Sequence, residues 1–342
     1  MADVAAGAAG VRAAPGLVTI DAIRAAAVTL RGIATRTPLV PFGPPAARRF
    51  LKAESLQPIG AFKIRGAYVA VSSLRPDERA RGVVTYSSGN HAQGVARAAR
   101  LLGTAAVIVM PSDAPALKKA RVEADGAEVV VVGPSSDERQ HVAEGLAAAR
   151  GLAIIPPFDD DRIIAGQGTV GLEIAEDLPD VAAVFVPIGG GGLVSGVAAA
   201  IKAMVPGARV IGVEPELAAD ARQSFREGRI VRWSPADVSR TIADGTRTAA
   251  IGVRTFAHIS ALVDDVVTVS EAEIAAGVRL AAEESRLVVE PSGAVSIAAM
   301  AFRAGESGVV GLKGPMVAVV SGGNVDPDQY RAYLEAPIPP RG

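Results

Sequence analysis

One lysine stands in a setting that suits covalent chemistry. Lys63 lies within Gly60-Ala61-Phe62-Lys63-Ile64-Arg65-Gly66-Ala67, among small residues and beside an aromatic ring. A protonated lysine is a poor nucleophile, but partial burial or a neighbouring cation lowers its pKa and frees the amine to attack a carbonyl. The apolar neighbours and Arg65 could supply both effects. The alternative is an ordinary surface lysine at the start of a helix.

A second segment predicts a phosphate site. An apolar run at 182–187 leads through Gly189-Gly190-Gly191-Gly192-Leu193 into a helical pattern. Consecutive glycines let several backbone N–H groups converge on one anion, and a helix N-terminus adds a favourable partial charge. Two alternatives stay open. One is a packing turn without a ligand; the other is a dinucleotide site with Glu214 as the ribose-binding acid, although the G-x-G-x-x-G spacing is not met.

Alternating strands and helices must position these residues. Short apolar runs predict strands at 83–86, 105–110, 129–132, 153–155, 182–187, 210–213, 266–269 and 316–320, with helices such as 93–102 and 195–204 between them. Continuous apolar strands separated by helices are typical of parallel sheets covered on both faces. Polar or glycine-rich loops follow three strands, at 87–91, 189–192 and 321–324. Because ligands bind beyond the carboxyl ends of parallel strands, we expect these loops to meet at one site.

Composition and charge exclude several classes of protein. The 342 residues are 49% hydrophobic and 4% aromatic, which suits α/β domains rich in small aliphatic side chains. A net charge of -1 without a basic run argues against a nucleic-acid partner. The absence of cysteine excludes disulfides and thiolate-held metal centres. With no signal peptide and no apolar run near the roughly 20 residues of a membrane span, we expect a cytoplasmic protein without a membrane partner.

Six motifs together resemble one family. They lie at 61–67, 87–94, 165–169, 189–193, 241–245 and 321–324. In this order they resemble the fold-type II pyridoxal-phosphate enzymes, in the branch of threonine dehydratases, serine dehydratases and serine racemases. The resemblance implies a two-domain α/β fold like that of the tryptophan synthase beta chain. It places a large cofactor-binding domain at 17–75 plus 158–342 and a small mobile domain at 76–157. It also implies pyridoxal 5'-phosphate as cofactor and a homodimer. Residues 1–16 have few groups able to bury anything, and we expect them to form a flexible tail.

The resemblance implies a role for each matching residue. Lys63 would form the Schiff base with the cofactor and take the substrate's α-proton, and in a racemase Ser88 would act on the opposite face. The cofactor-binding residues would be Phe62, Lys63, Asn90, Gly189, Gly190, Gly191, Gly192, Leu193, Glu290 and Ser321. The residues around the substrate would be Ser87, Ser88, Gly89, Asn90, His91 and Arg139.

The expected activity is the dehydration of L-threonine, L-serine or both to a 2-oxo acid and ammonia. Ser321 would face the pyridine nitrogen, and a neutral serine cannot keep that nitrogen protonated as a carboxylate would. The ring is then a weaker electron sink, which favours β-elimination. Ser88 favours serine racemisation as an alternative, and Arg139 favours 3-hydroxyaspartate, whose β-carboxylate a guanidinium binds well. For Arg139, the alternative is an ordinary solvated arginine on a helix. For the whole protein, the remaining alternatives are a dinucleotide-dependent oxidoreductase and a non-catalytic binding protein.

A cation site is the last expectation. The resemblance assigns Glu214, the carbonyl of Ala218 and Asp220 as ligands. Carboxylate and carbonyl oxygens are the hard ligands that Mg²⁺ and Ca²⁺ take. The alternative is a pair of solvated acids on a loop.

Overall fold

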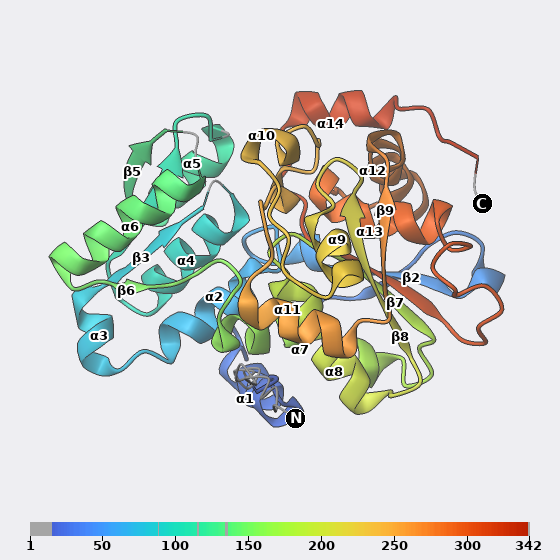
Figure 1. Ribbon diagram of the computed structural model, residues 1–342, viewed down its shortest axis with the longest axis horizontal. Coiled ribbons are helices and arrows are strands. Elements are labelled where there is room, and N and C mark those ends of the chain that lie inside the picture. The colour runs from blue at the N-terminus through green and yellow to red at the C-terminus, as the bar shows by residue number, and fades with distance from the viewer. Residues whose placement is uncertain (1–15, 88, 115, 134–135, 341–342) are drawn as a thin grey trace, which may run out of the picture.

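Two sheets covered by helices make up the molecule, in a computed structural model that describes residues 16–87, 89–114, 116–133 and 136–340 (Figure 1). The strands are β1 Leu39–Pro41, β2 Arg49–Ala53, β3 Val83–Tyr86, β4 Ala106–Pro111, β5 Glu128–Val132, β6 Ala153–Ile154, β7 Ala183–Pro187, β8 Arg209–Pro215, β9 Asp265–Val269 and β10 Met316–Val320. The expected tail at 1–16 falls, except for its last residue, outside the described residues.

Helices separate most of the strands. They are α1 Ile20–Thr29, α2 Lys63–Ser72, α3 Pro76–Arg81, α4 Asn90–Leu101, α5 Ala116–Ala124, α6 Ser136–Arg150, α7 Asp161–Asp177, α8 Gly192–Met204, α9 Asp220–Glu227, α10 Pro235–Val238, α11 Val253–Leu262, α12 Glu271–Ser285, α13 Pro291–Phe302 and α14 Pro327–Leu334. Three short 3-10 helices are η1 Pro45–Ala47, η2 Glu54–Leu56 and η3 Asp244–Thr246. Among the described helices, none is long and apolar enough to span a membrane.

The strand order confirms the predicted fold class. The larger sheet runs β1-β2-β10-β7-β8-β9 and the smaller runs β5-β4-β3-β6. Neighbouring strands are parallel in both sheets except for β1 and β2, which are antiparallel. All eight predicted strands are present, with bounds within two residues of those expected. The carboxyl ends of β3, β7 and β10 therefore carry the three loops that the sequence singled out.

The pair β1–β2 was missed because its sequence does not read as a buried strand. Arg49 and Lys52 interrupt the apolar pattern of β2, and Pro41 ends β1. Lys52 is nevertheless fully buried, since its Nζ donates to Glu173 Oε2 at 2.6 Å and to Thr37 O at 2.6 Å. A charged strand residue is tolerated inside the fold when a partner from a distant helix neutralises it.

Helix α2 joins the two halves of the molecule. Its residues Ala67 and Val71 belong to the same hydrophobic cluster as Val83 of the smaller sheet. On its other side it approaches α7 so closely that a Cβ built on Gly166 would lie 2.6 Å from Gly66 Cα. In Figure 1, α2 and α7 lie between the two sheets. The helix that begins at the lysine is thus fixed from both sides, and the division at 76 and 157 stays a prediction.

Candidate active site

A cavity of about 250 Å³ opens where the three loops and the start of α2 meet. The predicted site residues that line it are Phe62, Lys63, Ser87, Gly89, Asn90, His91, Arg139, Gly189, Gly190, Gly191, Gly192, Leu193 and Ser321. Ser88 lies outside the described residues. Glu290 does not line the cavity itself and instead contacts Asn90, which does. Glu214, Ala218 and Asp220 also lie outside the lining and are considered separately below.

Lys63 is the first residue of α2, and its backbone is held by the loop after β10. Phe62 N donates to Ser321 O at 3.1 Å, and Ala61 forms a bridge with Gly322. The Lys63 Nζ donates to Pro157 O at 2.7 Å and lies 5.3 Å from the centre of the Phe62 ring. Burial lowers the pKa of Lys63 to about 8. A lysine with this pKa loses its proton readily near neutral pH, as an amine that attacks a carbonyl must.

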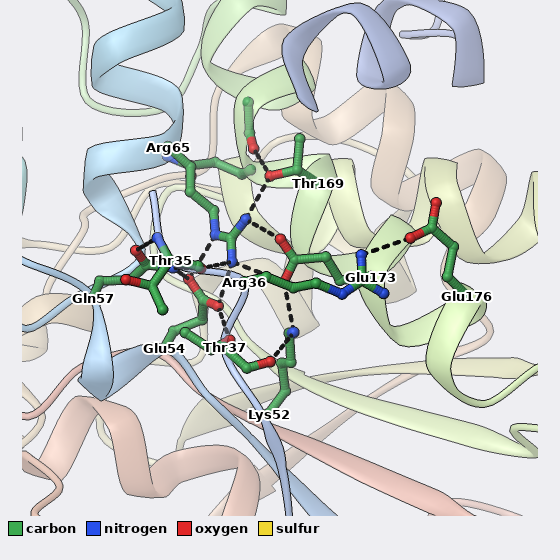
Figure 2. Close-up of polar contacts among 12 residues, drawn as sticks. Thr35, Arg36, Thr37, Lys52, Glu54, Gln57, Arg65, Thr169, Glu173 and Glu176 are labelled. Atoms are coloured by element: carbon green, nitrogen blue, oxygen red, sulfur yellow. Dashed lines mark hydrogen bonds and ion pairs between the residues drawn. The ribbon is translucent and has the colours of Figure 1, made fainter. Parts of the chain in front are cut away.

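Arg65 plays no part in lowering that pKa, so the expectation that it would is wrong. Its guanidinium is bound on one side by Glu54, at 2.8 Å from Nε to Oε2, and on the other by Glu173, at 2.6 Å from Nη1 to Oε1. Thr169 and Lys52 complete this buried cluster (Figure 2). The opposite charges attract and raise the pKa of Arg65, against the effect of burial. Arg65 instead ties α2 to η2 and α7.

The glycine loop between β7 and α8 is shaped by two close approaches. Gly191 has φ 91°, a left-handed conformation that favours glycine. A Cβ built on Gly190 would lie 2.1 Å from Phe158 Cδ1, and Thr255 Oγ1 donates to Gly190 O at 2.8 Å. Close packing against the Phe158 ring thus explains why position 190 is a glycine. The loop also lines the cavity, and the first N–H groups of α8 lack intrahelical acceptors, so the loop can hold an anion.

The loop after β3 leads into α4 at the cavity. Gly89 N donates to Ser87 Oγ at 3.2 Å, and α4 begins at Asn90. The first N–H groups of a helix have no intrahelical acceptor, which suits the binding of a carboxylate. His91 is buried and its Nε2 lies 3.1 Å from Ile155 O. Burial and the nearby Lys63 lower the pKa of His91 to about 3, so its ring stays neutral and donates to that carbonyl.

Asn90 connects the loop after β3 to Glu290, which precedes α13, and to Asn324 in the loop after β10. Its Nδ2 donates to Glu290 Oε1 at 2.5 Å, and its Oδ1 accepts from Asn324 Nδ2 at 2.8 Å. Glu290 precedes α13 without a capping hydrogen bond from its side chain, and burial raises its pKa to about 7. Ser321 Oγ donates to Ser292 O at 3.2 Å and also faces the cavity. The predicted residues Asn90, Glu290 and Ser321 are therefore brought together.

Four charged residues of the cavity were not assigned from the sequence: Lys118, Arg232, Asp244 and Arg247. Lys118 of α5 and Asp244 of η3 both line it, and they form an ion pair with Nζ 2.5 Å from Oδ2. Asp244 belongs to a motif at 241–245 that the resemblance included without a role. Lys118 sits beside Lys119 in a charged amphipathic helix, and such a pattern gives no sign that one of the two is buried.

Glu214 and Asp220 lie at the end of β8 and the start of α9. Both are buried, at 1% and 0% exposed, so the alternative of solvated loop acids is wrong. Glu214 accepts from the backbone N–H groups of Ala221 at 3.1 Å and Arg222 at 2.7 Å. Neither carboxylate oxygen of Asp220 has a hydrogen-bond partner among the described residues.

The electrostatics of this pair favour a cation. Burial and the charge of Asp220 raise the pKa of Glu214 well above its ordinary value. Burial raises the pKa of Asp220 to about 7, and the nearby backbone N–H groups of Asp220 and Ile251 offset this only in part. Two adjacent buried carboxylates are stabilised by a positive charge between them. Within the described residues no cluster of three or more His, Asp or Glu side chains forms a metal site, so a cation would also use carbonyls and water.

The residues of the main cavity fit pyridoxal phosphate. A lysine with a lowered pKa, a glycine loop at a helix N-terminus and a serine hydroxyl line one space. These groups can bind, respectively, an aldehyde, a phosphate and a ring nitrogen.

Comparisons with known proteins agree with this fit. The family model "Pyridoxal-phosphate dependent enzyme" matches residues 30–322. The chain is 44% identical to the L-threo-3-hydroxyaspartate ammonia-lyase of Saccharomyces cerevisiae, covering 84% of this chain and 86% of that protein. It is 41% identical to the serine racemase of Schizosaccharomyces pombe, covering 93% and 98%. The processed threonine deaminase isoform 2 of Solanum lycopersicum superposes with a TM-score of 0.83 at 38% identity, covering 94% and 95%.

The dinucleotide-dependent oxidoreductase is therefore wrong as an alternative, and Glu214 does not line the cavity as a ribose-binding acid would. The family match covers most of the chain, and the relatives include lyases and a racemase. The chain belongs to the pyridoxal-phosphate dependent enzymes of fold type II, in the branch of threonine dehydratases, hydroxyaspartate ammonia-lyases and serine racemases.

Proposed function

We propose that this protein is a hydroxy-amino-acid ammonia-lyase that removes water from L-threonine, L-serine or both. The observation that carries the proposal is the placement of Lys63 and Ser321 in one cavity, with a neutral hydroxyl rather than a carboxylate at the second position. Bound pyridoxal phosphate supplies an aldehyde that joins the substrate amine and a ring that withdraws electrons from its Cα. The products are a 2-oxo acid and ammonia.

The chain's own groups divide the remaining work. The backbone N–H groups at the start of α4 and the Ser87 hydroxyl hold the substrate carboxylate. Lys63 Nζ, with a pKa near 8, takes the proton from Cα. The first turn of α8 would hold the phosphate, and Asn90 would bind the ring of the cofactor. Half-buried Phe62 and Phe158 exclude water from this wall of the cavity.

L-threo-3-hydroxyaspartate is the second candidate substrate, favoured by the charges that line the cavity. The lining has the positive side chains Lys63, Lys118, Arg139, Arg232 and Arg247, but Asp244 is its one acid among the described residues. Asp244 and Glu290 compensate Lys118, and the phosphate and one substrate carboxylate would balance part of the remaining positive charge. A second carboxylate, bound by the guanidinium of Arg139, would balance more of it.

The test is 2-oxo acid release from L-serine, L-threonine and L-threo-3-hydroxyaspartate, with chiral analysis of recovered serine. Release from threonine or serine supports the first proposal. Arg139→Met should raise the KM for hydroxyaspartate alone, whereas Arg150→Met, at an exposed position of the same helix, should leave every KM unchanged. D-Serine without 2-oxo acid would contradict the lyase and favour a racemase using Ser88.

We also propose a Mg²⁺ or Ca²⁺ ion held by Glu214, the Ala218 carbonyl and Asp220. The unpaired, buried oxygens of Asp220 support it. A homodimer is a further proposal, supported by the family resemblance alone. A cytoplasmic location is another, supported by the sequence pattern.

A further inference from the structure

Lys118 crosses from one half of the molecule to the other. It lies on α5, beside the smaller sheet, and only 5% of its side chain is exposed. Its Nζ lies 2.5 Å from Asp244 Oδ2 and 3.7 Å from Glu290 Oε2, both on the side of the larger sheet. Burying an ammonium group is costly unless carboxylates compensate for its lost hydration. These two ion pairs, named here the Lys118 bridge, therefore tie α5 across the cavity.

The bridge also touches the loop that begins α4. A Cβ built on Gly89 would lie 3.5 Å from Lys118 Cδ and 3.6 Å from its Nζ, so the lysine side chain lies along that loop. The next residue, Asn90, donates to Glu290 Oε1 at 2.5 Å. One ammonium group thus lies along the loop on one wall of the cavity, pairs with Asp244 on the opposite wall, and reaches Glu290, which lies outside the lining.

Glu290 meets groups from four elements. Asn90 reaches it from α4, Lys118 from α5, Asp244 from η3, and the backbone of Gly322 from the loop after β10. Among these described neighbours Lys118 is the one positive charge. Burial raises the pKa of Glu290 to about 7, Lys118 acts to lower it, and Asp244 acts to raise it. Without Lys118 the two acids would face each other uncompensated.

We propose that Lys118 is a positioning residue that holds α5 against the cavity and favours the ionised form of Glu290, the acceptor for Asn90. Movement of α5 away from the larger sheet then removes the cation from two acids, and Glu290 takes up a proton. The position of α5 and the ionisation of Glu290 are thereby coupled, because α5 moves away as Glu290 takes up one proton. The inference rests on the geometry of the bridge and not on which amino acid is the substrate.

Hydrogen–deuterium exchange of the cofactor-loaded protein tests the bridge. In Lys118→Met the amides of 116–124 and 241–247 should exchange about tenfold faster or more, since a buried ion pair has been broken. Lys118→Arg should restore most of the protection. Lys119→Met is the matched control, because Lys119 is 42% exposed and pairs only within α5, with Glu123 at 3.8 Å. Equal exchange in Lys118→Met and Lys119→Met would overturn the proposal.

The pH profile separates a positioning role from simple packing. After correction for intrinsic rates, wild-type α5 should exchange faster at pH 6 than at pH 8, because protonated Glu290 no longer pairs with Lys118. Glu290→Gln should remove this dependence. A flat wild-type profile contradicts the proposal even if Lys118→Met does not fold. Neither readout involves turnover, so a wrong substrate assignment would leave both unchanged.

Discussion

Replacing Arg65 by methionine should destabilise the protein by about 3 to 5 kcal/mol, the cost of breaking a buried ion pair. The side chains of Arg65 and Glu54 are 2% and 0% exposed, and that of Glu173 is 12% exposed. Arg65→Met leaves two acids with Lys52 as the remaining cation of the cluster (Figure 2). The lost hydrogen bonds include those to Thr169 Oγ1 and Thr35 O, each 3.0 Å long.

Urea unfolding followed by circular dichroism measures this loss. Arg36→Met is the control within the same region, because Arg36 pairs with Glu176 at 2.7 Å but is 50% exposed. An exposed pair contributes at most about 1 kcal/mol. The double variant Arg65→Met with Glu54→Gln should lose less than the sum of its single variants, by roughly 1 kcal/mol or more, because the orphaned charge is gone. Equal losses in Arg65→Met and Arg36→Met would refute the reasoning.

The pH dependence of the stability loss in Arg65→Met tests whether Glu54 is the charge left unpaired. In the wild type, burial acts to raise the pKa of Glu54, but Arg65, with smaller contributions from Lys52 and Thr37, outweighs it and lowers that pKa. Without Arg65, burial should raise that pKa above its ordinary value of 4.5. A group with a raised folded-state pKa destabilises the fold as pH rises toward that pKa, so the loss in Arg65→Met should be smaller at pH 5 than at pH 8. A larger loss at pH 5 would contradict the assignment of Glu54 as the orphaned charge.

Three further outcomes are expected. Lys63→Ala should show no Schiff-base absorbance with pyridoxal phosphate and should lose turnover by orders of magnitude. Retained activity in this variant would contradict the proposed role of Lys63. Gly190→Ala should weaken cofactor binding roughly fivefold or more in an absorbance titration, because its Cβ would lie 2.1 Å from Phe158, whereas Gly207→Ala has nothing within 4 Å and should not. When a chelator is present, the midpoint of thermal unfolding should fall as the pH rises from 3.8 toward about 7, because buried Asp220 ionises over this range. Added Mg²⁺ should restore the midpoint, and an unchanged midpoint with chelator and with Mg²⁺ would argue against the cation site.

The sequence predicted the sheets and the loops well, because both depend on local patterns. Apolar runs without charges mark buried parallel strands, and all eight expected strands are present. Parallel strands place their carboxyl ends at one edge, so the loops after β7 and β10, neighbours in the larger sheet, had to lie together. The loop after β3 belongs to the smaller sheet, and the packing of the two sheets brings it to the same cavity. The glycine run and the lysine motif at 60–67 needed no tertiary information to be noticed.

Only the tertiary structure decided which charges are buried and with which partners. Lys52 and Arg65 read as ordinary polar residues, yet Glu173, more than 100 residues away in the chain, neutralises both. Lys118 and Asp244 are 126 positions apart, and no local pattern distinguishes Lys118 from exposed Lys119. The expectation that Arg65 lowers the pKa of Lys63 was also wrong, because the two residues are close in the chain but the charge of Arg65 is neutralised by Glu54 and Glu173. The energy of a buried charge depends on partners that folding brings together from distant segments, and that information lies outside any local window of the sequence.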